Sequence, residues 1–188
     1  MMYEQVMILN FPPYEQGDEF DCGFGICVSS LLYCGKDFDY QEIAEFLDTD
    51  ESGTLFTRMI ELMNQHEIDC TKKTMDIDEV KQWIRRRIPI ILPLQAWSEN
   101  PVTSYKEIWD QGHYVAVIGF DDKNKKMLFR DPSSKPVTFL TYEELPDRWH
   151  DVGKDGKVYE NYGLAIYDRK GFPPFMINFN PDTAIHMD

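Results

Sequence analysis

The segment QGDEFDCG, residues 16–23, places a cysteine six positions after a glutamine and directly before a stretch with helical periodicity. Ninety-one residues after Cys22, the segment GHYVAVIG (residues 112–119) opens an apolar strand with His113. The dipeptide DP at residues 131–132 follows that histidine by eighteen positions. A thiol, an imidazole, a carboxylate and a side-chain amide are the groups that nucleophilic catalysis by cysteine uses. We therefore expect a fold that brings the start of a helix to the start of a strand.

Cys22 is expected in the first turn of a helix over about residues 22–33, with Asp21 as a candidate N-cap. Cys27 and Cys34 share one face with the apolar residues of this helix, whereas Cys22 lies about 140° around from Cys27. A helix N-terminus also favours the thiolate, which is the reactive form of cysteine. The sequence therefore predicts core positions for Cys27 and Cys34 and a reactive position for Cys22.

Apolar spacing and turn residues divide the rest of the chain into further helices and strands. A helix over about 54–66 is expected to be capped by Thr54, and Thr141 with Glu144 forms a capping box before a short helix. The apolar segment 88–94 contains two prolines, which predicts an edge or a bulged strand. The remaining helices are expected at about 40–47 and 78–87, and the remaining strands at about 69–75, 113–120, 127–130, 135–140 and 162–167.

Because helices come first and strands later, the chain is expected to be an α+β protein with N-terminal helices packed on a C-terminal antiparallel sheet. If the strand beginning at His113 pairs antiparallel with the strand ending near Arg130, Asp131 lies beside the imidazole. Its carboxylate can then fix the ring tautomer. Taken singly, these residues are a core thiol, a core histidine and a turn aspartate, but their combined order favours a site.

Composition narrows the class of partners and the compartment. With 19 basic and 33 acidic residues among 188, the net charge is −14, which disfavours nucleic acids and anionic membrane surfaces as partners. The four cysteines form no C-x-x-C pair, so neither a disulfide framework nor a zinc site is expected. No signal peptide and no apolar run of about 20 residues is visible. We therefore expect a cytoplasmic protein without membrane insertion, and its oligomeric state stays open.

The motifs together resemble those of a known family. Gln16, five residues, Cys22 and a helix with small residues resemble the start of bacteriocin leader-processing cysteine peptidases, the C thirty-nine peptidases of the papain-like clan. Residues 113–119 and 131–132, and a later helix with a leucine and a tryptophan, are similar to their further motifs. The match covers roughly residues 14–150. The resemblance implies a papain-like fold.

The resemblance also implies a role for each motif residue. It makes Cys22 the nucleophile, His113 the general base and Asp131 the residue that orients the imidazole. Gln16 then joins the backbone N–H of Cys22 in binding the oxyanion. The implied substrate is a peptide or protein, with no metal and no organic cofactor. Because the best-known members are fused to a membrane exporter, the resemblance does not extend to the cleavage of double-glycine leaders.

We expect one peptidase domain over residues 1–188, with a core at about 14–168. An aromatic loop at 96–112 and a Pro- and Phe-rich tail at 169–188 are expected to be additions to that core. Aromatic residues of the loop are candidates for the wall of the substrate cleft, although anchoring of the loop by packing explains them equally well. They are Trp97, Tyr105 and Trp109.

Two other functions use the same fold. A deamidase or transglutaminase has the same triad but a different acceptor for the acyl group. Product analysis with and without a primary amine separates this alternative from the peptidase. A non-catalytic peptide-binding module has no need of a reactive thiol. Absence of labelling at Cys22 by iodoacetamide or an electrophilic peptide favours this last alternative.

Overall fold

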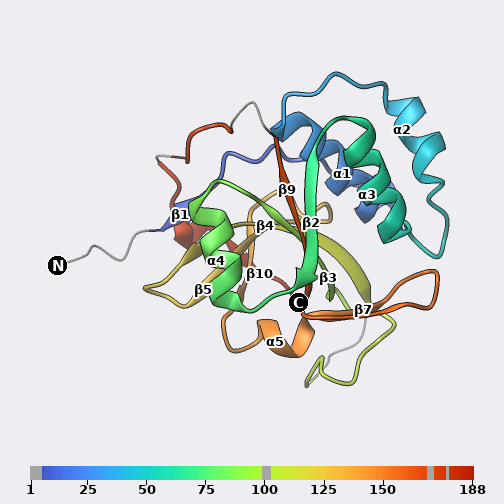
Figure 1. Ribbon diagram of the computed structural model, residues 1–188. Helices are drawn as coiled ribbons and strands as arrows, with labels where there is room; N and C mark the ends of the chain where they lie inside the picture. The colour runs from blue at the N-terminus through green and yellow to red at the C-terminus, as the bar shows by residue number, and fades with distance from the viewer. Residues whose placement is uncertain (1–5, 99–102, 169–171, 177) are drawn as a thin grey trace.

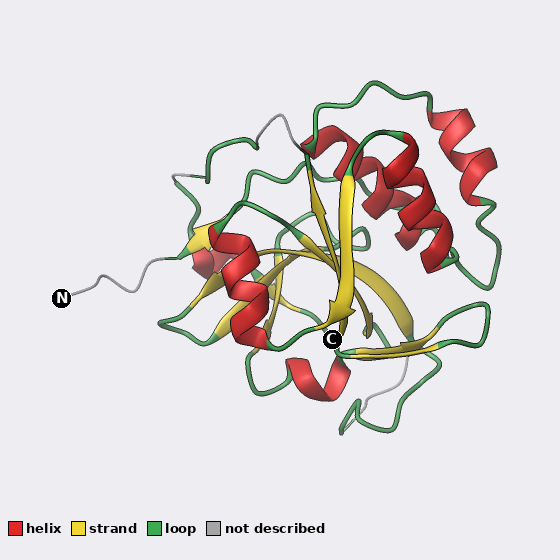
Figure 2. Cartoon of the chain, in the orientation of Figure 1, coloured by secondary structure: helices red, strands yellow, loops and turns green. Residues whose placement is uncertain are grey.

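The computed structural model describes residues 6–98, 103–168, 172–176 and 178–188. Within these residues the chain forms an α+β domain in which helices pack on a curved, mainly antiparallel sheet (Figure 1, Figure 2), so the predicted fold class is confirmed. The described sheet has eight strands: β1 (Met7–Ile8), β2 (Asp69–Thr74), β3 (Ile90–Gln95), β4 (Gly112–Asp121), β5 (Lys126–Arg130), β6 (Thr138–Thr141), β9 (Tyr162–Tyr167) and β10 (Ile185–His186). A separate hairpin contains β7 (His150–Val152) and β8 (Val158–Glu160).

The strand order along the sheet is β10-β6-β5-β4-β3-β9-β2. The short strand β1 pairs with the C-terminal part of β4, at Gly119 and Phe120. Among the described pairs β10 with β6 is parallel and the others are antiparallel. Both β3 and β4 lie in the middle of the sheet, and all of β3 and nearly all of β4 is buried. The strand that carries His113 is therefore paired with β3 from Gly112 to Val117 and with β5 from Ala116 onward.

Three helices gather on one side of the domain and a fourth lies apart from them (Figure 1). The helix α1 (Cys22–Tyr33) packs on β4 and also contacts α2 (Tyr40–Leu47) and α3 (Phe56–Gln65), so it connects the helical group to the sheet. Helices at about the positions of these four were expected from the sequence. The described helices are α1 (Cys22–Tyr33), α2 (Tyr40–Leu47), α3 (Phe56–Gln65), α4 (Ile77–Arg85), α5 (Leu145–Arg148) and the 3₁₀ turn η1 (Pro181–Thr183).

The prediction of an edge or bulged position for β3 is wrong. This strand pairs with β4 along its whole length and with β9 at Ile90 and Ile91. Pro89 precedes the strand, and Pro93 lies beyond the last residue paired with β9, where its missing N–H costs no ladder bond on that side. The bulge of this sheet lies instead in the β4–β5 pair, between Val117 and Gly119.

The expected capping-box bonds of Thr141 and Glu144 form, although α5 begins only at Leu145, and the expected cap of α3 is wrong. Thr141 and Glu144 form the reciprocal capping-box bonds, with the Glu144 carboxylate accepting from the Thr141 N–H at 3.0 Å and the Thr141 hydroxyl accepting from the Glu144 N–H at 3.2 Å. Thr54 does not cap α3, which begins at Phe56. Its hydroxyl instead lies 2.7 Å from the hydroxyl of Thr49.

The tail is more regular than the sequence indicated. Ile185 and His186 form β10 and extend the sheet beside β6, and the His186 imidazole lies 2.8 Å from the Glu144 carboxylate. Upstream, Phe175 bridges Leu9 in antiparallel fashion. A two-residue strand is too short to give a periodic signal in the sequence, and the tail acquires its order from long-range pairing.

Candidate active site

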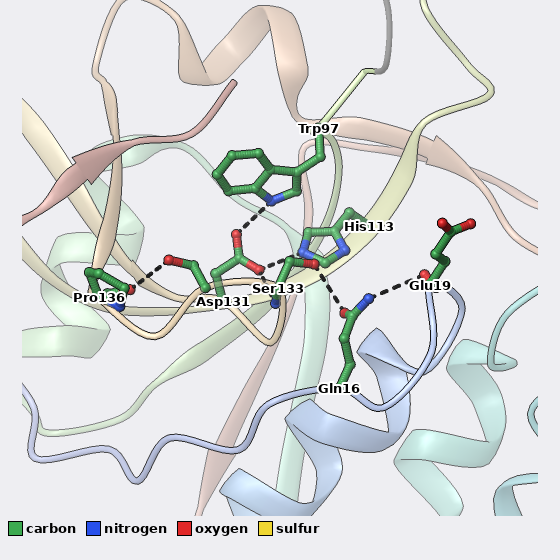
Figure 3. Close-up of polar contacts among 8 residues, drawn as sticks. Gln16, Glu19, Trp97, His113, Asp131, Ser133 and Pro136 are labelled. Atoms are coloured by element: carbon green, nitrogen blue, oxygen red, sulfur yellow. Dashed lines mark hydrogen bonds and ion pairs between the residues drawn. The ribbon is translucent and has the colours of Figure 1, made fainter.

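His113 and Asp131 meet at one end of the β4–β5 pair. His113 is the second residue of β4 and Asp131 directly follows β5, and the register that pairs Ala116 with Arg130 brings the two side chains together. The Nε2 atom of His113 lies 2.7 Å from Oδ1 of Asp131, and the two side chains are 7% and 0% exposed (Figure 3). The antiparallel pairing expected from the sequence is confirmed, and Nδ1 is the ring nitrogen left for another partner.

Two further donors hold the carboxylate of Asp131. The backbone N–H of Ser133 donates to Oδ1 at 2.8 Å, and the indole N–H of Trp97 donates to Oδ2 at 2.9 Å (Figure 3). Burial alone would raise the pKa of Asp131. The charge and hydrogen bond of His113, together with the other two donors, outweigh burial, so the pKa of Asp131 lies below its usual value. The buried group facing the imidazole is therefore an ionised carboxylate with fixed orientation.

Cys22 is the first residue of α1, is 6% exposed, and lies within hydrogen-bonding reach of the His113 side chain. Burial lowers the pKa of His113, but the charge and hydrogen bond of Asp131 and those of Cys22 outweigh burial and raise the pKa to about 10. At neutral pH the imidazole therefore carries a proton between a carboxylate and a thiol. This is the arrangement that an imidazolium–thiolate pair requires.

The N-terminus of α1 is open to an anion. Asp21 occupies the N-cap position as predicted, but its side chain makes no capping bond, and the first turn contains no acidic residue. The backbone N–H of Cys22 has no acceptor within the helix. A Cβ atom on Gly25 would lie 3.2 Å from Cβ of Pro132, so this glycine lets α1 approach the turn that carries Asp131.

The other thiols differ from Cys22 in position. Cys27 is fully buried, as predicted, and burial raises its pKa well above the usual range. Cys34 is at the C-cap of α1 and only half-buried, so the prediction of a core position is only partly met. Burial raises the pKa of Cys34 and of Cys70 to about 12 each. Among the four thiols, Cys22 is the one in contact with His113.

Gln16 is tied to the same turn as Asp131. Its backbone N–H donates to the carbonyl of Pro132 at 3.0 Å, and its side-chain Oε1 accepts from the hydroxyl of Ser133 at 3.1 Å. The Nε2 group donates to the Glu19 carbonyl at 3.3 Å (Figure 3). An amide group carries two N–H bonds, and this contact uses one of them. The structure thus fixes the amide near the turn and leaves one of its donors without an acceptor in the described residues.

The thiol opens into a cavity of about 340 Å³. Its lining comes from the loop before α1, the loop before α3, the start of β4 and the β7–β8 hairpin. Acidic side chains outnumber the single lysine. The lining residues are Glu19, Phe20, Cys22, Glu51, Ser52, Gly53, Thr54, Trp109, Asp110, Gly112, Tyr114, Asp151, Val152, Gly153 and Lys154. Gln16 lies in a neighbouring hollow of about 510 Å³, and both spaces share Glu19 and Phe20 as lining.

The aromatic residues of the 96–112 loop have separate positions. Trp109 lines the cavity, is 38% exposed and packs on His150 with ring centroids 4.3 Å apart. Trp97 is not among the residues that line this cavity and instead donates to Asp131. Tyr105 is buried beneath the guanidinium of Arg148, 3.8 Å from its ring centroid. The part of this loop at residues 99–102 lies outside the described residues.

Sequence reasoning missed one contact and one side chain at this site. The first is the contact from Trp97 to Asp131, and the second is the carboxylate of Asp151, which lines the cavity beside Cys22. Asp151 stands in a short hairpin strand with no motif around it, so only the packing of β7 near β4 reveals it. Trp97 was a candidate because it is a large aromatic residue in the loop. The direction of its side chain depends on the contact with Asp131, which lies 34 positions later in the sequence.

Within the described residues, no group of three or more His, Cys, Asp or Glu side chains is arranged to hold a metal ion. The described helices also include none that is long and apolar enough to cross a membrane.

Comparison with known proteins gives one family and a set of similar folds. The model of the Peptidase_C39 like family matches residues 8–157. The chain matches none of the curated proteins.

The solved structures that resemble the chain are peptidase domains. A Bacillus anthracis protein described as a C39-like peptidase has a TM-score of 0.65 and 17% identity, covering 88% of this chain and 98% of its own. The peptidase domain of Streptococcus ComA, a bifunctional ABC transporter involved in quorum sensing, has a TM-score of 0.61 and 17% identity over 85% of this chain and 100% of its own. A double-glycine-motif protease from an AMS/PCAT transporter, in complex with its leader peptide, has a TM-score of 0.57 and 14% identity over 87% and 99%. These similarities establish the fold.

Proposed function

Because the chain belongs to the Peptidase_C39 like family, we propose that it is a cysteine peptidase that cleaves a peptide bond through a thiol acyl-enzyme. The observation that carries this proposal is the contact series from Cys22 through His113 to Asp131, at the wall of a cavity wide enough for a peptide segment. We propose one peptidase domain over residues 1–188, since the core, the loop and the tail pack on a single sheet in the described residues.

The first half of the reaction uses the thiol and the imidazolium together. The sulfur of Cys22 attacks the substrate carbonyl carbon, a C–S bond forms, and the carbonyl electron pair moves onto oxygen. As this oxyanion collapses, the C–N bond breaks and His113 gives its proton to the departing amine. The acid in this step is the same imidazolium that the thiolate had stabilised. Consuming the thiolate removes one of the two groups that raise the His113 pKa, which favours this proton transfer.

The second half hydrolyses the thioester. Neutral His113 takes a proton from water, the resulting hydroxide attacks the acyl carbon, and the C–S bond breaks to release the acid and restore Cys22. Asp131 holds the ring through Nε2 throughout, so Nδ1 stays directed at the reacting atoms. Trp97 acts as a positioning residue, because its indole N–H holds the second oxygen of that carboxylate.

The developing oxyanion is assigned two donors. One is the backbone N–H of Cys22 at the open N-terminus of α1, and the other is the unused N–H of the Gln16 side chain. Ser133 supports the second donor by holding the Gln16 amide oxygen from the same turn that carries Asp131. One turn would thus align the base and the oxyanion site together.

The direct test uses peptidyl vinyl sulfones, which form a stable thioether with an activated cysteine. Peptide mapping of the intact chain after incubation is expected to find the adduct at Cys22 and not at Cys27, Cys34 or Cys70. The His113→Ala variant, with correct folding shown by circular dichroism, is expected to lose the adduct. Equal labelling of Cys22 and Cys70, or labelling that persists in the variant, would contradict the proposal. Cleavage products from a peptide library, analysed with and without a primary amine, separate hydrolysis from amide transfer.

A further inference from the structure

The carboxylate of Asp151 lies in the cavity beside the thiol and has no part in the chemistry above. We propose that Asp151 binds a basic side chain of the substrate, lysine or arginine, close to the scissile bond. This inference rests on the proposed peptidase function and adds a substrate class to it.

Asp151 is 8% exposed and lines the cavity into which Cys22 opens. Its Oδ1 atom accepts two hydrogen bonds, from the backbone N–H of Val152 at 2.8 Å and from the side-chain amide of Gln95 at 3.0 Å. Its Oδ2 atom has no hydrogen-bond partner within the described residues. One oxygen is therefore anchored, and the other is left to a group that enters the cavity.

A buried support holds this carboxylate in place. Gln95 is fully buried and is itself fixed, since its Oε1 accepts from the Gln111 N–H at 2.9 Å and its Nε2 also donates to the His150 carbonyl at 3.1 Å. Asp151 also lies against Gly112, where an added Cβ would be 2.5 Å from Oδ1. The carboxylate thus sits over the residue directly before His113, at the end of β4 that faces Cys22.

The positive charge that acts on Asp151 is the imidazolium of His113, which is already paired with Asp131. No lysine or arginine forms an ion pair with Asp151 within the described residues. Lys154, the basic residue of the cavity lining, pairs with Asp50 at 2.7 Å. The rim adds Glu19, Glu51 and Asp110, all exposed. A buried carboxylate without an ion-pair partner of its own is costly, and a substrate cation would offset that cost.

Two other arrangements fit these observations less well. Asp151 is not part of a metal site, because the described acidic residues form no group of three around it. It also does not orient His113, because Asp131 already occupies Nε2. Burial outweighs the hydrogen bonds of Asp151 and the charge of His113 and raises its pKa to about 6, so the carboxylate is mainly ionised at neutral pH.

The test compares small thiol reagents that differ in charge alone. 2-Aminoethyl methanethiosulfonate is cationic, its n-propyl analogue is neutral and of the same length, and the 2-carboxyethyl analogue is anionic. In each reaction the Cys22 thiolate attacks the sulfenyl sulfur, a disulfide forms and methanesulfinate leaves. The rate at Cys22 is measured by peptide mapping, so other thiols do not contribute. We expect the cationic reagent to react about tenfold faster or more than the neutral one, and the anionic one to react more slowly.

The Asp151→Asn variant keeps an acceptor for Val152 and Gln95 and removes the charge. We expect its cationic-to-neutral rate ratio to fall to about one to three, and the ratio cancels any change in Cys22 reactivity that both reagents share. The matched control is Glu61→Gln, which removes one negative charge from an exposed position of α3 and should keep the wild-type ratio. A wild-type ratio near one overturns the inference even if Asp151→Asn fails to fold. Equal cationic-to-neutral rate ratios in Asp151→Asn and Glu61→Gln would also overturn the inference.

A second arm tests the peptide itself. N-acetyl dipeptide vinyl sulfones with lysine or norleucine next to the electrophile are compared at Cys22, and lysine is expected to be preferred by about tenfold in the wild type alone. Equal rates for lysine and norleucine, at either residue of the dipeptide, would contradict a site for basic side chains. Failure of the neutral reagents to modify Cys22 at all would instead contradict the peptidase function, so the two failures are distinguishable.

Discussion

At the scale of single residues, the site depends on charges that are buried and paired. His113 has an ionised carboxylate on one side and a thiol on the other, and the two together keep its pKa at about 10 against the opposing effect of burial. Asp131 is held by three donors from three parts of the chain: His113, Ser133 and Trp97. Removing any one of these contacts should therefore act on the imidazole, and through it on the thiol.

Asp131→Asn should lower kcat by about 10²–10⁴, because the amide preserves the shape but loses the charge that stabilises the imidazolium and can fix the wrong tautomer. The double variant with His113→Ala should lose far less than the product of the two single losses, because the residues act as one unit. Steady-state kinetics of the four proteins checks this. Fully multiplicative losses would show that the two side chains act independently.

Gln16→Ala should lower kcat by about 10²–10³ and change KM little, because its donor strengthens its interaction only as charge develops on the oxygen. The comparison is made on one peptide substrate. Ser133→Ala is the informative companion, since it removes the hydroxyl that holds the Gln16 amide and should cause a smaller loss of the same kind. Full kcat in Gln16→Ala would mean that the oxyanion site is built from other donors.

Asp151→Asn should make the protein more stable at neutral pH. The pKa of Asp151 is raised from 3.8 to about 6 in the folded protein, so the folded state holds that proton more tightly than the unfolded chain. The stabilising effect of protonation is complete below about pH 4 and is lost as the pH rises through about 6. The variant should therefore gain about 1–3 kcal/mol in the free energy of unfolding near pH 7.5 and little near pH 4. Urea titrations at both pH values check this, and a variant that is less stable at both would contradict it.

At the scale of elements, the local signals of the chain were sufficient to predict α1, β4 and β5 with nearly their observed bounds. Each has a strong pattern: a helix with a defined start, and two apolar strands joined by a tight turn. Together they bring Cys22, His113 and Asp131 into contact, so this part of the site followed from the sequence. The central position of β3 did not, because which strand lies beside it depends on β9, more than 70 residues later in the chain.

The approach of α1 to the Asp131 turn depends on a glycine. Gly25→Ala would add a Cβ at 3.2 Å from Pro132, so the helix or the turn must move by a few tenths of an ångström. Since alanine also favours helix by about 0.5–1 kcal/mol over glycine, we expect little change in Tm but a several-fold lower kcat. Leu32→Ala, on the exposed side of the same helix, should keep full kcat. Unchanged kcat in Gly25→Ala would show that the site tolerates this shift.

At the scale of the whole molecule, the tail and the loop connect to the active site through Trp97. The backbone of Trp97 has a left-handed φ of 58°, a costly conformation for a side chain of this size. Its N–H donates to the carbonyl of Asp188, while its indole donates to Asp131. Neither contact has a signal in the sequence, because each joins segments that are far apart in the chain. This explains why the tail was expected to be a mere addition.

Removing residues 184–188 should therefore impair catalysis as well as stability. The deletion removes β10 and the acceptor of the Trp97 N–H, and we expect a several-fold loss of kcat with little change in KM. Trp97→Phe should cause a similar loss, and combining the two should add little. Thermal unfolding measured alongside separates the effect on the fold. A truncated protein with full kcat would show that the tail does not act on the site.

The central claim is that Cys22 is paired with the imidazolium of His113, and the pH dependence of its alkylation tests this most directly. The rate of iodoacetamide modification at Cys22, followed by peptide mapping between about pH 5.5 and 9, should be higher in the wild type than in His113→Ala, most of all at the acidic end of this range. In His113→Ala it should fall about tenfold for each pH unit below the ordinary thiol range. A wild-type rate that rises steeply with pH and coincides with that of His113→Ala would contradict the account.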